Sequence, residues 1–352
     1  MASPDSSPSE PHPDGVLQTD VVIVGAGPVG LFAVFELGML KMRAHLVDAL
    51  DMVGGQCAAL YPEKPIYDIP AWPKIEAQAL IAQLQQQIAP FAPTFHLGEQ
   101  VTSLEPLPGG RRRVTTSAGT RIDCAAVIIA AGAGAFGPNR PPLEGIEHYE
   151  RRSVHYMVRR REDFRGKRIV IAGGGDSAVD WAVSLAEVAD RIHVVHRRPK
   201  FRAAPDMVAR MQQLADAGRV EMVVPYQLHG LEGDPASGQL SAVVVATLEG
   251  ETKRLEADAL LPFFGLAMNL GPIAEWGLAL EKHHLVVDPA TCRTSEDGIY
   301  AIGDVVTYPG KLKLILTGFS EAAMAAHDIY GRVFPDQALH FEYSTTKGVP
   351  GT

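Results

Sequence analysis

Two glycine-rich turns, each placed between a short buried strand and a helix, most restrict what this chain can fold into. The first reads Gly25-Ala-Gly-Pro-Val-Gly30 and follows an apolar strand-sized run; the second reads Gly173-Gly-Gly-Asp-Ser-Ala178 and also follows one. In both places a helical stretch and a further strand come next, so each forms a β-α-β unit. Two such units in 352 residues predict an α/β fold with two Rossmann-like dinucleotide-binding domains.

Each glycine of the first turn has a physical role. Gly25 permits the tight turn, Gly27 lets the backbone approach a pyrophosphate, and Gly30 lets helix and strand pack closely. Pro28 lies in the same turn, and the N-terminus of the helix expected over Leu31–Leu40 offers unpaired N–H groups to phosphates. The second turn is predicted to bind a second dinucleotide in the same way. Its expected contacts are Gly173, Gly175, Asp176, Ser177 and Ala178.

The residues that follow the two turns differ in charge. Asp48 ends the second strand of the first unit, where a carboxylate accepts hydrogen bonds from ribose hydroxyls. The corresponding position of the second unit is His196, followed by Arg197 and Arg198, with Arg202 slightly further on. A carboxylate repels a 2′-phosphate, whereas guanidinium groups bind it. We therefore expect the second site to select NADPH over NADH, although a solvated basic loop has the same composition.

Two dinucleotides in one chain imply electron transfer between them. Nicotinamide supplies hydride and a flavin is its usual acceptor, so the first site is predicted to hold FAD.

Charge and composition exclude several classes of protein. The net charge of −9 disfavours a nucleic-acid binder, and no apolar run approaches the ~18 residues of a membrane span. The three cysteines are scattered, so neither a disulfide framework nor a metal cluster is expected. Residues 1–17 lack the features of a signal peptide and are predicted to be a disordered lead-in to a cytoplasmic protein.

One segment departs from the acidic average. Residues 151–168 are rich in arginine and lysine, and with Lys311 and Lys313 they could attract an acidic protein partner. A solvated connection with spare positive charge is the alternative.

The chain resembles the bacterial ferredoxin–NADP⁺ reductases of the thioredoxin-reductase-like type. The stretches that carry the resemblance are GGQCAALYPEKPIYDIPAWPK (54–74), GAFGPNRP (134–141), GGGDSAVDWA (173–182), HRRPKFRA (196–203), GLAMNLGPIAEWGL (265–278), YAIGDVVTYPGKLKLILTGFSEA (300–322) and YSTTKG (343–348). The resemblance implies a homodimer, an FAD-binding domain of residues 18–132 and 293–341, an NADPH-binding domain of residues 133–292, and a tail, 342–352, over the flavin.

Carried over by position, the resemblance implies FAD contacts at Asp48, Gln56, Tyr61, Val101, Phe136, Asp304 and Thr345. Tyr61 would stack on one face of the flavin ring. Tyr343 is the candidate for the other face, although some relatives carry histidine before the corresponding Ser-Thr pair. A packed core tyrosine and a loose tail residue are the alternatives for these two positions. Gly303-Asp304, on its own, is also typical of an ordinary turn.

The expected reaction is hydride transfer from NADPH to FAD, followed by one-electron transfer to ferredoxin or flavodoxin, without a protein acid or base. A thioredoxin reductase of similar build carries a cysteine pair shortly before its second glycine turn; here residues 153–167 contain no cysteine. A thiol reductase is therefore disfavoured. A general NADPH diaphorase or quinone reductase, and a non-catalytic FAD- and NADPH-binding sensor, stay open.

Overall fold

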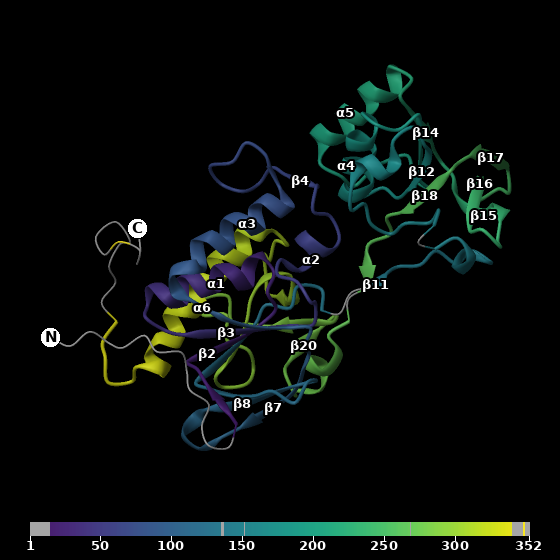
Figure 1. Cartoon of the computed structure of the whole chain (residues 1–352). Coiled ribbons are helices and arrows are strands. Elements are labelled where there is room, and N and C mark those ends of the chain that lie inside the picture. The colour runs from purple at the N-terminus through teal and green to yellow at the C-terminus, as the bar shows by residue number, and fades with distance from the viewer. Residues whose placement is uncertain (1–14, 135–136, 151, 268, 340–347, 349–352) are drawn as a thin grey trace. The chain divides into compact units, whose positions relative to one another are not determined.

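The computed structural model describes residues 15–134, 137–150, 152–267, 269–339 and 348 (Figure 1). Within these ranges the chain forms two compact units. The first comprises residues up to 59, residues 65–134 and residues from 269 onward; the second comprises 60–64 and 137–267.

A five-stranded parallel sheet forms the centre of the first unit. Its order is β22 (Ile299–Ala301), β10 (Ala126–Ile129), β2 (Val21–Val24), β3 (Ala44–Asp48) and β6 (Thr94–Leu97). All four residues of β2 are buried, because both faces of the sheet are covered. Val22 and Val24 point into the core under one face, while Ile23 lies beneath the start of the helix that follows.

Helices cover one face of this sheet and strands cover the other. On the helical side α1 (Pro28–Met39) packs against both α3 (Ala77–Ile88) and α6 (Ile315–Val333), as Figure 1 shows. The opposite layer is a four-stranded sheet of β1 (Leu17–Gln18), β9 (Arg121–Cys124), β8 (Arg112–Thr116) and β7 (Val101–Pro106). Because α1 is enclosed by the sheet and two helices, its sequence is apolar on nearly every side.

The remaining elements of the first unit are short. They are α2 (Gly55–Ala59), β4 (Pro65–Ile66), β5 (Ile75–Glu76), β20 (Leu280–Glu281), β21 (His284–Val286), β23 (Val306–Thr307), and the 3₁₀ turns η1 (Ala89–Phe91), η2 (Pro108–Gly110), η5 (Gly271–Glu275) and η6 (Gly303–Val305).

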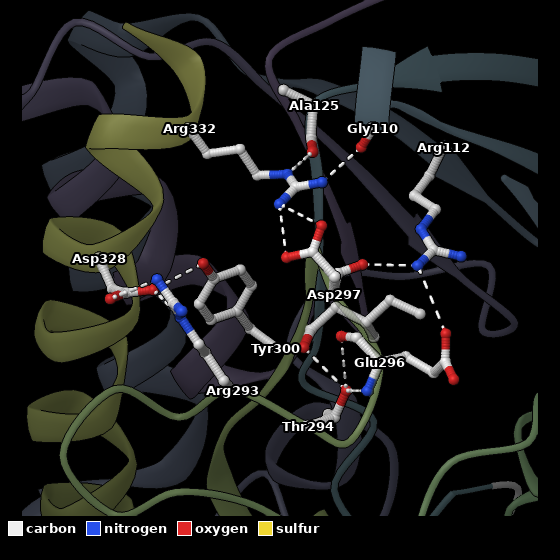
Figure 2. A network of polar contacts seen from close by, with 11 residues as sticks. Gly110, Arg112, Ala125, Arg293, Thr294, Glu296, Asp297, Tyr300, Asp328 and Arg332 are labelled. Carbon is white, nitrogen blue, oxygen red and sulfur yellow. Dashed lines mark hydrogen bonds and ion pairs between the residues drawn. The ribbon is translucent and has the colours of Figure 1, made fainter. Parts of the chain in front are cut away.

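Arg332, near the end of α6, ties this last helix to the rest of the first unit (Figure 2). Its Nε donates to the carbonyl of Ala125 at 2.7 Å, a second nitrogen donates to the carbonyl of Gly110, and the third pairs with Asp297. Arg112 in turn donates to the carbonyl of Asp297 at 2.6 Å. One planar guanidinium thus joins three segments that are distant in sequence.

The second unit repeats the layered plan. Its parallel sheet has the order β14 (Val220–Val223), β13 (Arg191–Val195), β12 (Arg168–Ala172) and β18 (Ala259–Pro262). Ile169 and Ile171 face the core beneath α4 (Asp176–Leu185) and α5 (Pro205–Asp216), whereas Val170 faces a core shared with an antiparallel sheet. The other elements are β11 (Gly137–Pro138), β15 (Gln227–Asp234), β16 (Gln239–Ala246), β17 (Thr252–Glu256), β19 (Leu266–Ala267), η3 (Ile146–His148) and η4 (Arg161–Phe164).

The chain returns to the first unit earlier than residue 293. Leu270, Ile273 and Leu278 are buried in the core of the first unit, and β21 pairs with β23 there, so residues 269–292 pack with that unit. At the other end Val16 is buried and Leu17 pairs with Ile122, so order begins before residue 17; residues 1–14 lie outside the described ranges. Among the described residues, every helix is too short or too polar to traverse a lipid bilayer.

Candidate dinucleotide sites

The first glycine turn connects β2 to α1. A Cβ on Gly25, whose φ is +116°, would lie 2.4 Å from the Ala130 carbonyl oxygen, and one on Gly30 would lie 2.1 Å from the oxygen of Gly25. Side chains are therefore excluded at both positions. Gly27, the residue before α1, is open by contrast, because its nearest neighbour would be 3.9 Å away. Pro28 is the first residue of the helix. The helix N-terminus is thus accessible beside an uncrowded glycine, as phosphate binding requires.

Asp48 ends β3 and braces this turn. Its Oδ2 accepts the Ala26 N–H at 2.7 Å and its Oδ1 accepts the Leu50 N–H at 2.8 Å. Burial raises the pKa of Asp48, and the two backbone donors oppose the rise. A carboxylate has about four acceptor positions, so further ones stay available for ribose hydroxyls.

Three other residues expected at the first site are described. Gln56 lies on α2, and its Nε2 would be 3.4 Å from a Cβ on Gly132. Val101 has its side chain buried in the core between the two sheets, so its main chain alone is available to a ligand. Asp304 lies in η6 directly after β22; burial raises its pKa, and Lys311 and Lys313 oppose that rise. Phe136, Tyr343 and Thr345 lie outside the described residues.

Tyr61 belongs to the second unit. Its ring packs against the core formed around α4, and Lys64 Nζ lies 5.6 Å from the ring centroid. Lys64 pairs with Asp180 on α4 at 3.0 Å, and Glu63 accepts the Arg161 N–H at 2.8 Å. The structure therefore groups the expected flavin-stacking tyrosine with the helix that follows the second glycine turn.

The second turn connects β12 to α4. Gly173 has a φ of +154°, and a Cβ there would lie 2.7 Å from the Phe263 oxygen. A Cβ on Gly174 would lie 2.2 Å from the ring of His196, whereas one on Gly175, before α4, would meet nothing within 4 Å. Gly174 thus makes room for the imidazole, and Gly175 leaves open space in front of the helix. Ala178, which replaces the third glycine of the first turn, is buried.

The basic loop, residues 196–203, is held against the second glycine turn by two hydrogen bonds. The Arg202 N–H donates to the Gly174 oxygen at 2.7 Å, and the Ala204 N–H donates to Asp176 Oδ1 at 3.0 Å. Burial lowers the pKa of His196, and the neighbouring arginines lower it further, so the ring is neutral at pH 7. Ser177 is exposed at the start of α4.

Arg197, Arg198 and Arg202 are exposed, and none of the three forms an ion pair with any described residue. The three arginines predicted from their spacing after the second glycine turn therefore lie next to the N-terminus of α4, without ion-pair partners among the described residues. An anion is bound most favourably at such a place.

The run 151–168 is much less positive than its sequence indicates. Arg160 pairs with Asp163, Arg165 with Glu162, and Arg161 with Glu187. Arg168 pairs with both Glu256 and Asp258.

Lys311 is also not an exposed charge: its side chain is 5% exposed and pairs with Glu321. The expectation that Lys311 contributes to partner attraction is therefore wrong, because the ammonium group is buried against a carboxylate. Glu321 was not predicted from the sequence to be a functional residue. A signal was present, because Glu321 occupies one of the positions of residues 315–333 that lie on the buried face of the helix.

All three cysteines are buried thiols within the described residues. Burial raises the pKa of both Cys124 and Cys292 to about 12. Thiols with such pKa values are not thiolates at neutral pH and do not attack disulfides.

The two parallel sheets, each with a glycine turn at a helix N-terminus, define an α/β protein that binds two dinucleotides. A family model described as pyridine nucleotide-disulphide oxidoreductase matches residues 19–327, and the chain belongs to that family.

Comparisons with individual proteins agree. A ferredoxin–NADP reductase of Granulibacter bethesdensis is 65% identical over 350 residues, covering 99% of this chain and 98% of that protein. Another of Paramagnetospirillum magneticum is 65% identical over 333 residues, covering 95% and 98%. Among solved structures, thioredoxin reductase of Lactococcus lactis has a TM-score of 0.78 at 24% identity, covering 90% of this chain and 99% of that one. The predicted fold class and the family resemblance are confirmed.

Proposed function

We propose that this chain transfers electrons between NADPH and ferredoxin by way of FAD, which the first unit would hold. The observation that carries the proposal is the reversal of charge between two otherwise equivalent sites, Asp48 after the first turn and Arg197 and Arg198 after the second. The curated relatives at 65% identity are named ferredoxin–NADP reductase, which supports the same activity.

The residues present fit FAD at the first turn. The open approach at Gly27 suits a pyrophosphate, and Asp48 retains acceptor capacity for ribose hydroxyls. The proposed FAD-binding residues are Gly25, Gly27, Pro28, Gly30, Asp48, Gln56, Tyr61, Val101, Phe136, Asp304 and Thr345, with Tyr343 as a second ring-stacking candidate. When bound there, FAD would supply the redox chemistry that links a two-electron donor, NADPH, to a one-electron acceptor such as ferredoxin.

The proposed NADPH-binding residues are Gly173, Gly175, Asp176, Ser177, Ala178, His196, Arg197, Arg198 and Arg202. The N–H groups at the start of α4 would bind the pyrophosphate, and the exposed guanidinium groups would bind the 2′-phosphate. Neutral His196 packs beside Gly174 and adds no charge. The protein therefore binds and orients, and no side chain needs to accept a proton.

The proposed reaction can be tested by absorption spectroscopy and by kinetics. Purified protein is expected to be yellow, to bleach anaerobically with NADPH much faster than with NADH, and to reduce added ferredoxin. Colourless protein that does not take up FAD would contradict the proposal. Bleaching without ferredoxin reduction, but with rapid quinone reduction, would indicate a diaphorase.

The family resemblance also leads us to propose a homodimer in the cytoplasm, with flavodoxin as the alternative to ferredoxin as electron acceptor. Light scattering at several protein concentrations tests the dimer: a mass of one chain, 37.8 kDa, at every concentration would contradict it.

A further inference from the structure

A carboxylate is buried in the first unit beside the turn that carries Asp304. Glu321 lies on α6, is 0% exposed, and is followed by the buried alanines Ala322, Ala325 and Ala326. An ionised group in such surroundings is costly unless it is fully paired. Hydrophobic packing alone therefore does not account for a glutamate at this position.

Each oxygen of Glu321 has a defined partner. Oε2 accepts the Gly303 N–H at 2.6 Å, while Oε1 accepts the Tyr308 hydroxyl at 2.6 Å and pairs with the buried Nζ of Lys311. Tyr308 has its pKa raised by burial and by the bond to Glu321, so it remains a hydroxyl donor. The carboxylate is thus satisfied by one backbone donor, one neutral side chain and one cation.

The backbone donor is the informative partner. Gly303 has a φ of +81°, and a Cβ there would contact Val29, the second residue of α1, at 3.6 Å. A Cβ on Gly318 of α6 would lie 2.4 Å from the same valine. The turn after β22, the start of α1 and α6 therefore converge closely, and Glu321 fixes the turn from the buried side.

Asp304 is the next residue along the turn. Its carboxylate accepts no hydrogen bond from the described part of the chain. It is half-buried near two lysines, and burial raises its pKa. A half-buried carboxylate that receives no hydrogen bond from the described residues has its acceptor positions available for the hydroxyl groups of a ligand. The hydrogen bond from Gly303 to Glu321 sets the backbone from which this acceptor projects.

We infer that Glu321 is a positioning residue for flavin binding: by accepting the Gly303 N–H, with its charge balanced by Lys311, it holds Asp304 ready for the hydroxyl groups of FAD. This inference rests on the proposed function. It assigns Lys311 the task of neutralising Glu321, in place of contact with a protein partner.

The test measures FAD affinity of the full-length apoprotein by fluorescence titration. Glu321→Gln is expected to raise the Kd for FAD at least about tenfold, because a charge-assisted hydrogen bond to the turn is weakened. Asp328→Asn is the matched control, since Asp328 lies on the same helix and also binds a tyrosine and a cation, Tyr300 and Arg293. The control should leave the Kd within about twofold.

A double-mutant cycle separates positioning from general stability. If Glu321 acts through the turn, Glu321→Gln should matter little, less than about threefold, once Asp304→Asn is present. Equal effects in both backgrounds, or an equal effect of Asp328→Asn, would overturn the inference. Wild-type protein that fails to bind FAD would instead overturn the proposed function, and this inference with it.

A milder variant serves if Glu321→Gln does not fold. Tyr308→Phe removes one donor to Glu321 and leaves the ion pair. It should weaken FAD binding a few-fold in the wild-type background, change the visible circular dichroism of bound flavin, and lose its effect beside Asp304→Asn. An unchanged Kd and spectrum would count against the role of Glu321.

Discussion

Lys64 Nζ lies 3.0 Å from Asp180 Oδ2, and the two side chains are only 20% and 13% exposed. This contact joins the short segment 60–64, which carries Tyr61, to the middle of α4, whose first turn faces the proposed NADPH phosphates. The ring-stacking candidate Tyr61 and α4, the helix proposed to bind NADPH, are therefore held together within one unit.

Removal of Lys64 should destabilise the second unit in a pH-dependent way. Burial raises the pKa of Asp180, and Lys64 lowers it. In Lys64→Met the folded-state pKa rises further above the unfolded value, so the loss of stability should be small near pH 4 and grow toward pH 8. We expect about 1–3 kcal/mol at pH 8, measured by urea unfolding.

The control for this variant is Lys253→Met, whose pair with Glu221 is 43% and 42% exposed. It should cost no more than about 1 kcal/mol, because exposed pairs are screened. A loss in Lys64→Met that stayed constant from pH 4 to pH 8 would refute the proposed linkage to Asp180.

Alanine substitutions at two neighbouring glycines, Gly174 and Gly175, should distinguish an effect on folding stability from an effect on NADPH binding. Gly174→Ala places a methyl group 2.2 Å from the His196 ring, so the variant should unfold at a lower temperature, and His196→Ala should relieve the loss. Gly175→Ala meets no atom within 4 Å and should fold normally, yet bind NADPH weakly because the methyl group occupies the phosphate approach. Thermal melts and NADPH titrations check both; normal NADPH affinity in Gly175→Ala would argue against this site.

Loss of two arginines should abolish the preference for NADPH. Arg197→Ala with Arg198→Ala removes exposed guanidinium groups that form no ion pair with the described residues. Each charge-assisted contact contributes ~1.5–3 kcal/mol, so kcat/KM for NADPH should fall at least about tenfold while that for NADH stays nearly constant. Arg254→Ala is a suitable control, because Arg254 is paired with Glu232. Equal losses with both nucleotides would assign the arginines another role.

The cysteines should be chemically silent in the native protein. With pKa values near 12 for Cys124 and Cys292, and with Cys57 buried as well, a chromogenic disulfide reagent at pH 8 should react only after denaturation. Treatment with iodoacetamide should leave ferredoxin reduction intact. Rapid labelling of one thiol together with loss of activity would reopen the possibility of a thiol mechanism.

Local chemistry explains which parts of this molecule could be predicted from sequence. Gly25, Gly30 and Asp48 lie within one β-α-β unit, so their spacing was sufficient to predict the turn and an acid at the end of the next strand. The basic loop after β13 (Arg191–Val195) was predictable for the same reason, because Arg202 closes on Gly174 within the next β-α-β unit. The hydrogen bonds by which Asp48 braces the turn were not predicted.

Contacts between distant segments were not predictable. From the sequence Lys311 was expected to be a surface charge, but in the fold it pairs with Glu321 of α6. Tyr61 was expected in the first unit, but the pair between Lys64 and Asp180 holds its segment in the second unit. The early return of the chain near residue 269 depends on the pairing of Leu285 with Val306, two short strands that have little local signal. Each of these features results from tertiary packing, which sequence periodicity does not encode.

The role of Arg332 has a consequence for the order of events during synthesis. Its guanidinium closes the first unit by binding Gly110, Ala125 and Asp297, so that unit lacks these contacts until Arg332 has left the ribosome. The inserted second unit is fully translated some sixty residues earlier, once Ala267 has emerged. The nascent chain can therefore complete its second unit first, while the early strands of the first unit wait for α6, which is synthesised later.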